Sequence, residues 1–294
     1  MGPPEVLRRQ LSERLSFSVP PAPAVQTTER SRADGYERHT LRYRVSDGDP
    51  VDAFFLRPQG EGPFAAVVAY HQHNSQWHLG KSEVIGLAGE PLQAFGPALA
   101  ARGVAVLAAD QVGFEDRRLG ARGTEVGPND WLEYFNAMAY RLLRGQLLMA
   151  KVLADASVAL SVLAARDDVD ASRIGAVGHS MGGNTVLFHA ALDRRIHFAC
   201  ASGAACTFRT RMQHQTGIEM ASVIPGLTHL CDIDDLVRLG PRRMLLVSGE
   251  GDEFARDAGA VADAAGVEHA LHGRGHALDA ERFRVISDWL IDAA

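Results

Sequence analysis

Apolar and polar positions follow two different rhythms along the chain, and together they predict strands that alternate with helices. Continuous apolar runs at residues 64–70 and 104–109 suit strands that are buried on both faces, and residues 243–249 also predict a strand. In residues 146–165 the apolar side chains instead recur every three or four positions, which predicts an amphipathic helix. This alternation indicates an α/β fold with a mostly parallel central sheet and helices on both faces.

The first part of the chain departs from this alternation. Residues 1–30 are expected to hold a short amphipathic helix and a proline-rich link, leaving residues 31–294 as the main domain. The helix would pack on the domain or on a neighbouring subunit, or remain a partly ordered tail. Residues 38–45 and 51–57 are strand-like and are joined by an Asp-Gly turn, which predicts an antiparallel hairpin at the start of the sheet.

Two long stretches, residues 111–144 and 203–238, have no regular apolar period. Both follow predicted strands and would leave the sheet at the carboxyl ends of those strands. Open α/β sheets bind their ligands at that edge. We therefore expect the two insertions to form a cap over a site there.

The motif that gives this site its chemistry is Gly178-His179-Ser180-Met181-Gly182, which lies between a predicted strand and a predicted helix. This is the G-x-S-x-G pattern in the context that it requires. The tight turn pushes the serine out of the sheet edge, and glycines on either side avoid a collision there. Ser180 is the candidate nucleophile, and the backbone N–H of Met181 is a candidate oxyanion donor at the helix N-terminus. The alternative is a glycine-rich turn with an incidental serine.

A serine nucleophile needs a base, and the base needs an orienting carboxylate. After such a turn the expected chain order is Ser, then Asp or Glu, then His. Asp252 follows the strand at residues 243–249, and His276 lies in a glycine-rich loop before the last predicted helix, so we assign them as acid and base. The rival residues are Glu250, Glu253 and Asp257 for the carboxylate, and His269 and His272 for the base.

The second oxyanion donor should come from the loop that follows the strand at residues 64–70. The backbone N–H of His73 is the first candidate and that of Gln72 the second. A metal site built from His71, His73 and His78 is the alternative, but no cysteine or carboxylate nearby completes a ligand set, so no metal is expected. The candidate substrate-pocket residues are Gln72, Trp77, Trp131 and Phe135, although aromatic residues in a cap can equally form its own small core.

Composition excludes several other classes of function. The net charge of −6 and the absence of a basic block argue against a nucleic-acid partner. No apolar run reaches the length of a membrane span, and charged residues interrupt residues 7–17, so no signal peptide is expected. The three cysteines have no metal-binding spacing, and we expect reduced thiols in a cytoplasmic protein.

The residues around Ser180 resemble the α/β-hydrolase superfamily, and within it the branch of dienelactone hydrolases and acetyl xylan esterases. Residues 109–117 and 167–183 carry this resemblance, which extends over roughly residues 64–294. It implies an α/β-hydrolase fold with Ser180 as nucleophile, Asp252 as acid and His276 as base. The chain has His71-Gln72 where the branch usually has His-Gly, which leaves the second oxyanion donor open. It also has serine where dienelactone hydrolases use cysteine, which favours ester hydrolysis over that lactone reaction.

The sequence therefore predicts a serine hydrolase that cleaves a small-molecule carboxylic ester through an acyl-enzyme on Ser180, without a cofactor. The same three side chains would also serve a thioesterase, an amidase or peptidase, or an acyltransferase. A binding protein that uses the hydrolase fold without catalysis is the alternative from another class. The N-terminal helix is a candidate contact for a homodimer.

Overall fold

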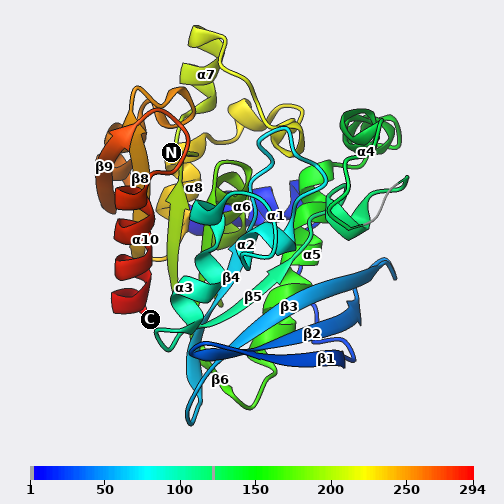
Figure 1. The fold of residues 1–294 in the computed structure, drawn as a ribbon. Coiled ribbons are helices and arrows are strands. Elements are labelled where there is room, and N and C mark those ends of the chain that lie inside the picture. The colour runs from blue at the N-terminus through cyan, green and yellow to red at the C-terminus, as the bar shows by residue number, and fades with distance from the viewer. Residues whose placement is uncertain (1–2, 121–122) are drawn as a thin grey trace.

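A nine-stranded mixed sheet runs through the computed structural model, which describes residues 3–120 and 123–294 (Figure 1). Its strand order is β1-β2-β3-β5-β4-β6-β7-β8-β9. Strands β1, β2, β3 and β5 pair antiparallel in that order, whereas β5, β4, β6, β7, β8 and β9 run parallel. The strand bounds are β1 Gln26–Ala33, β2 Tyr36–Arg44, β3 Pro50–Pro58, β4 Phe64–Tyr70, β5 Ala105–Ala109, β6 Val169–His179, β7 Phe198–Ser202, β8 Arg243–Glu250 and β9 Glu268–Arg274.

Helices cover both faces of the sheet. Side chains of α1, α5, α6, α8 and α9 join one core cluster, and those of α2, α3 and α10 join the other. The helix bounds are α1 Pro4–Arg14, α2 Lys81–Val84, α3 Phe95–Ala100, α4 Asp130–Leu143, α5 Leu148–Ala164, α6 Met181–Leu192, α7 Phe208–His214, α8 Ile233–Leu239, α9 Ala258–Ala265 and α10 Ala280–Ala293. Short 3₁₀ helices are η1 Pro91–Gln93, η2 Glu115–Arg117, η3 Met220–Ser222, η4 Leu227–His229 and η5 Glu253–Ala255. These layers confirm the predicted α/β fold with its early antiparallel hairpin.

Two elements differ from the sequence-based expectation. Strand β1 crosses residue 30, the predicted end of the N-terminal link, and none of its residues is buried. An edge strand without a buried face has no apolar alternation, so its sequence gives no strand signal. Helix α4 lies in the first insertion, which was expected to be irregular. Only Asp130 and Tyr134 of α4 are buried, although the apolar residues at positions 131, 134, 135, 138 and 142 have the spacing of a helical stripe.

The predicted cap segments contribute unequally. Helices α4 and α7 lie at the top of the view in Figure 1, at the opposite end from the β1–β3 strands. Helix α8 also falls within the predicted segment 203–238, but it packs on α6 and α9 and so belongs to the helix layer. Among the described residues no single helix is long and apolar enough to cross a membrane, and α4 with α5 meets that test only as a pair bent by 106°.

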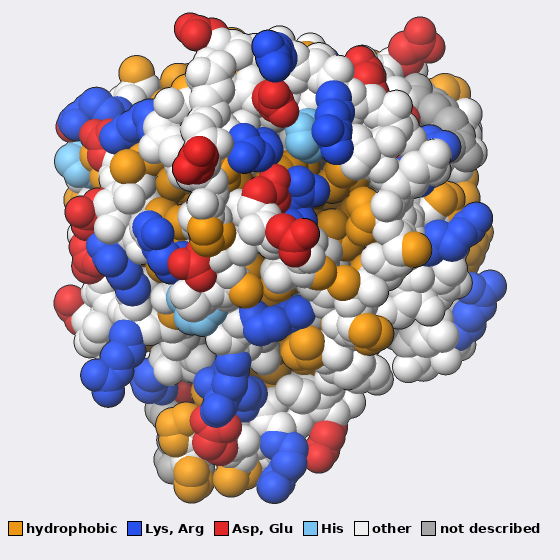
Figure 2. Space-filling model, turned by 90° about the horizontal axis from the view of Figure 1, so that it is seen from below, with side chains coloured by type: hydrophobic (Ala, Val, Ile, Leu, Met, Phe, Trp, Pro, Cys, Tyr) orange, Lys and Arg blue, Asp and Glu red, His pale blue; other side chains and the backbone are white. Residues whose placement is uncertain are grey.

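The surface seen from below carries both signs of charge. Basic and acidic side chains are interspersed on that face, with hydrophobic side chains between them (Figure 2). Neither sign dominates this face.

Helix α1 packs on its own domain, against α6 and α8. Leu11 of the helix and Leu15, which directly follows it, are buried in the core. The guanidinium of Arg8 donates to the carbonyl of Ala191 and, at 2.9 Å, to that of Leu239. Because these carbonyls lie at the ends of α6 and α8, Arg8 satisfies acceptors that those helices leave open.

Replacing Arg8 with alanine should therefore destabilise the whole fold by about 1–2 kcal/mol, since two carbonyls lose a charged donor. Arg9 is the matched control, because it lies next to Arg8 on α1 but is 69% exposed and has only a loose ion pair with Glu13 at 3.9 Å. Urea unfolding should place the Arg9→Ala variant within error of wild type. Equal midpoints for both variants would mean that α1 is not part of the cooperative unit.

A buried ionic cluster lies where β5 ends. The ammonium of Lys81 is 2.7 Å from Asp110 Oδ2, 2.7 Å from Glu115 Oε1 and 2.6 Å from Asp116 Oδ2. The three carboxylates lie close enough together to hold a metal ion, but the Lys81 ammonium already lies among them. Burial raises the pKa of Asp110 to about 7 despite the nearby ammonium. The cluster ties the start of the first insertion to the sheet.

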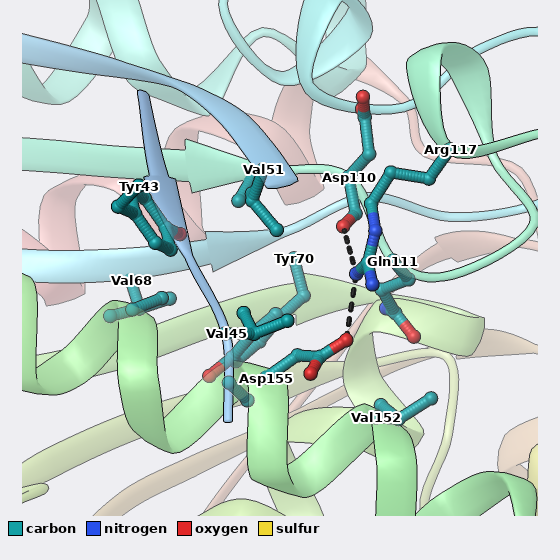
Figure 3. Close-up of a pocket in the computed structure, with 13 residues that line it drawn as sticks. Tyr43, Val45, Val51, Val68, Tyr70, Asp110, Gln111, Arg117, Val152 and Asp155 are labelled. Atoms are coloured by element: carbon teal, nitrogen blue, oxygen red, sulfur yellow. Dashed lines mark hydrogen bonds and ion pairs between the residues drawn. The ribbon is translucent and has the colours of Figure 1, made fainter. Parts of the chain in front are cut away.

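Next to this cluster, Arg117 links the insertion to α5. Its guanidinium donates to the carbonyl oxygen of Asp110 at 3.2 Å and to Asp155 Oδ2 at 2.7 Å (Figure 3). The small cavity in this view has a volume of about 20 Å³ and is lined by Tyr43 and Tyr70 among others. That volume is about the room needed for one water, so this cavity is too small for a substrate.

Candidate active site

Ser180 occupies a strained turn between β6 and α6. Its backbone has φ 56° and ψ −118°, and its N–H donates to the carbonyl of Ser202 at 2.8 Å. A Cβ on Gly178 would lie 2.4 Å from the carbonyl carbon of Gly182, and one on Gly182 would lie 2.3 Å from the carbonyl oxygen of Tyr70. Only glycine fits at either position, which is why the motif needs both. The turn presents the serine side chain beyond the carboxyl end of β6.

The structure brings the three candidate catalytic side chains together. His276 Nε2 lies 2.8 Å from Ser180 Oγ, and His276 Nδ1 lies 3.0 Å and 3.2 Å from the two carboxylate oxygens of Asp252. The Asp252 side chain is fully buried, whereas that of His276 is 29% exposed. With Nδ1–H donating to Asp252, the Nε2 lone pair faces the serine hydroxyl. This is the tautomer that general-base catalysis requires.

Neighbouring groups fix the orientation of the imidazole. Asp252 Oδ1 also accepts the backbone N–H of Phe254 at 3.0 Å, which holds the carboxylate in place. The ring of His276 packs against Phe254 and His179, with centroids 4.6 Å and 4.9 Å away. Burial lowers the pKa of His179 well below its usual value. His179 therefore stays neutral and does not oppose a positive charge on His276.

The rival residues lie outside this hydrogen-bond chain. Glu253 is exposed at the start of η5. Glu250 pairs with Arg274, Asp257 accepts hydrogen bonds from Thr207 and Thr210, His269 contacts Ser248, and His272 pairs with Glu281.

Ser180 lies at the wall of a cavity of about 420 Å³. Of the predicted pocket residues, Gln72, Trp77 and Trp131 line it, as does His73. Phe135 is not among the lining residues. It lies one helical turn from Trp131 and stacks on that ring with centroids 5.4 Å apart, so the pair forms an aromatic surface on α4.

Residues that sequence reasoning missed also line the cavity. Tyr134 of α4, Arg211 of α7 and Glu219 line it together with Met181. Tyr134 and Glu219 come from the two insertions, so both insertions form part of the site. Each lies far from Ser180 in the chain, and no local motif marks either one. In the sequence, Glu219 stands out only as an acidic residue between two apolar residues, Ile218 and Met220.

The histidines of the loop after β4 are bonded to protein groups. His71 Nδ1 donates to the carbonyl of Gln72 at 2.8 Å, and its Nε2 accepts the N–H of Gln111 at 3.1 Å. Burial lowers the pKa of His71 to about 4, so the ring is neutral. His73 Nε2 lies 3.0 Å from Glu219 Oε2. These contacts use ring nitrogens of two of the three histidines in the alternative metal site.

A family model for acetyl xylan esterases (AXE1) matches residues 16–217. The Bacillus subtilis (strain 168) protein YtaP, provisionally named as a hydrolase, is 36% identical over 159 residues, which are 53% of this chain and 49% of YtaP. The matched region thus spans about half the length of that curated relative.

Solved structures share the fold of this chain. An acetyl xylan esterase from Paenibacillus sp. R4 superposes with a TM-score of 0.67 at 18% identity, covering 97% of this chain and 93% of its own. A Bacteroides fragilis NCTC 9343 protein, provisionally assigned as an acetyl xylan esterase, gives 0.73 at 17% identity, covering 92% and 74%. At such identities these likenesses show the fold alone. The family match covers more than half of the chain, and the chain therefore belongs to the acetyl xylan esterase (AXE1) family of α/β-hydrolases.

Proposed function

We propose that the protein is a serine hydrolase that cleaves a carboxylic ester of a small molecule through an acyl-enzyme on Ser180. The observation that carries this proposal is the continuous hydrogen-bond chain from Ser180 through His276 to Asp252. Membership of an esterase family favours an ester over a thioester or an amide as the substrate.

The geometry supports a two-step mechanism. Ser180 Oγ attacks the acyl carbonyl while His276 Nε2 takes its proton, and the resulting tetrahedral intermediate collapses when His276 returns that proton to the leaving alcohol. A water molecule then attacks the acyl-enzyme, with His276 again as base, and releases the carboxylic acid. Asp252 keeps the imidazole in the required tautomer and stabilises its cation.

The negative charge on the intermediate needs two hydrogen-bond donors. The N–H of Met181 belongs to the first turn of α6, where backbone donors have no partner within the helix. The second donor is the backbone N–H of His73, with that of Gln72 as the alternative. Both residues lie in the loop after β4 and line the cavity beside Ser180.

Covalent labelling tests the proposal directly. A fluorophosphonate should add one equivalent to the folded protein, and trypsin should place the label on the peptide of residues 174–194, in which Ser180 is the single serine. The unlabelled enzyme should hydrolyse a small aryl ester faster than the matched thioester or amide. Folded protein that takes up no label, with no turnover of any of the three substrates, would support the non-catalytic alternative instead.

A further inference from the structure

Glu219 joins three segments of the chain at the cavity wall. Its Oε2 lies 3.0 Å from His73 Nε2, and its Oε1 accepts the hydroxyl of Tyr134 at 2.7 Å. His73 belongs to the loop after β4, Tyr134 to the first insertion and Glu219 to the second. Only 6% of the Glu219 side chain is exposed, so it is a buried carboxylate. We call these two contacts the Glu219 bridge.

Hydrogen bonding indicates which nitrogen of the His73 ring faces Glu219. The backbone N–H of Ser75 donates to His73 Nδ1 at 2.9 Å, so that nitrogen carries the lone pair and the ring proton is on Nε2. The Nε2–H therefore donates to Glu219. Burial by itself would raise the pKa of Glu219, but the hydrogen bonds from His73 and Tyr134 hold it below its usual value. Glu219 is thus an anion that accepts from both partners.

The loop that carries His73 depends on such contacts. Asn74 and Ser75 have φ 37° and φ 56°, left-handed backbone that residues with a Cβ rarely adopt. The His73 ring is fixed on one side by stacking on Trp77, with interplanar angle 7° and centroids 6.2 Å apart. On the other side Glu219 fixes its Nε2. Removing the Glu219 contact would free the ring and relax the strained turn.

Glu219 itself is held rigidly from its own segment. Arg211 is 4% exposed, and its guanidinium donates to the carbonyl of Gly217 at 2.8 Å and to that of Phe254 at 3.0 Å. Phe254 packs against the His276 ring. The same buried cation thus ties the segment before Glu219 to the residue that supports the catalytic base.

We propose that Glu219 is a positioning residue for ester hydrolysis, acting through His73 to hold the loop of residues 72–76 so that its backbone donor faces the oxyanion formed at Ser180. This inference rests on the proposed function. It assigns Glu219 no contact with the reacting atoms. It explains why a carboxylate lies buried in a cavity wall, beside the site where negative charge develops: both of its oxygens are engaged by donors.

The decisive variant is Glu219→Gln. A glutamine keeps the size but removes the charge, so His73 loses an anionic acceptor whether the new NH₂ group faces its Nε2–H or donates to the Tyr134 hydroxyl, which can also accept. We expect kcat for a small aryl ester to fall about 10- to 100-fold, since a displacement of about 1 Å at an oxyanion donor has effects of that size. KM should change less than about threefold, because the ground-state ester does not depend on that donor.

Two further variants complete the design. Tyr134→Phe removes one donor and leaves the carboxylate on His73, so we expect a smaller fall in kcat of about three- to tenfold. Glu253→Gln is the matched control, because it removes the same charge at an exposed position beside Asp252 and should turn over like wild type. Fluorophosphonate titration would give kcat per functional site, and thermal melting would report folding separately.

The outcomes separate the two proposals. Wild-type kcat in Glu219→Gln, or an increase in KM with kcat unchanged, would overturn the positioning role while leaving the serine mechanism intact. Full activity in Ser180→Ala would instead overturn the proposed function. If Glu219→Gln does not fold, Tyr134→Phe decides, and an unchanged kcat in that variant would overturn the inference.

Discussion

Replacing Ser180 with alanine should lower kcat on a small aryl ester by about 10⁴- to 10⁶-fold, because no other group can form the acyl-enzyme. The fold should survive, since alanine removes only a hydroxyl group from a turn that Gly178 and Gly182 define. Wild type and variant should melt within about 2 °C of each other. Hydrolysis of the aryl ester, followed over hours at high enzyme concentration, measures the residual rate.

A serine at the other end of the same strand provides the control. Ser172 is exposed, and its hydroxyl donates to Asp170 at 2.6 Å. Ser172→Ala should keep full activity, which shows that loss of a hydroxyl from β6 is harmless outside the turn. A Ser180→Ala variant that retains more than about 1% of kcat would contradict the acyl-enzyme mechanism, since the remaining oxyanion donors account for much less.

The proximity of the three candidate catalytic residues could be predicted because each one has a local cause. Ser180 lies in a turn where a Cβ on Gly178 or Gly182 would come within 2.4 Å or 2.3 Å of backbone atoms. The glycines of the motif therefore indicate this turn in the sequence. Asp252 and His276 each follow a strand of the parallel sheet, and such strand ends meet at one edge. Strand order and the position of each loop were therefore enough to bring these residues together.

The positions that sequence reasoning missed have partners far away in the chain. Glu219 contacts residues 73 and 134, and Lys81 contacts residues 110, 115 and 116. No sequence pattern close to Glu219 or Lys81 indicates those partners. The exposed strand β1 was missed for a different reason, since it has no apolar alternation. Helix α4 does have apolar residues at helical spacing, so its pattern was present in the sequence and was overlooked.

The loop after β4 shows how a departure from the family pattern is accommodated. Gln72 stands where the resembling branch usually has glycine, and its side-chain amide donates to Glu83 Oε1 at 3.2 Å. The side chain is therefore bonded to α2, at a buried position. His71 anchors the same loop from the other side through Gln111. The loop is held by side chains, which is consistent with the dependence on Glu219 inferred above.

The largest effect on stability should come from Lys81→Met, which leaves Asp110, Glu115 and Asp116 without their shared cation. Side-chain exposure is 3% for Lys81, 1% for Asp110 and 3% for Glu115, so their charges cannot be screened by water. Removing one partner of such a buried set costs about 3–5 kcal/mol. Urea unfolding at pH 8 measures this loss as a lower midpoint at unchanged slope.

Lys151→Met is the matched control for that variant. Lys151 also contacts three carboxylates, but those of Asp47 and Asp49 are 50% and 51% exposed. The third, Asp155, keeps Arg117 at 2.7 Å after the substitution. No carboxylate is left buried without a partner, so the loss should be about 1 kcal/mol. Equal losses of unfolding free energy in the two variants would mean that burial of the Lys81 cluster does not determine how much it stabilises the fold.

The pH dependence of the Lys81→Met deficit follows from the sign of the Asp110 shift. Burial already raises the pKa of Asp110 to about 7, above its value in an unfolded chain, and loss of the ammonium removes the group that opposes this rise. A carboxyl group with a raised folded-state pKa binds its proton more tightly when folded, so stability is lost as the pH rises through the unfolded and then the folded value. The deficit relative to wild type should therefore be smaller at pH 5 than at pH 8. A deficit that is the same at both pH values would show that the cluster stabilises the protein by packing and not by charge.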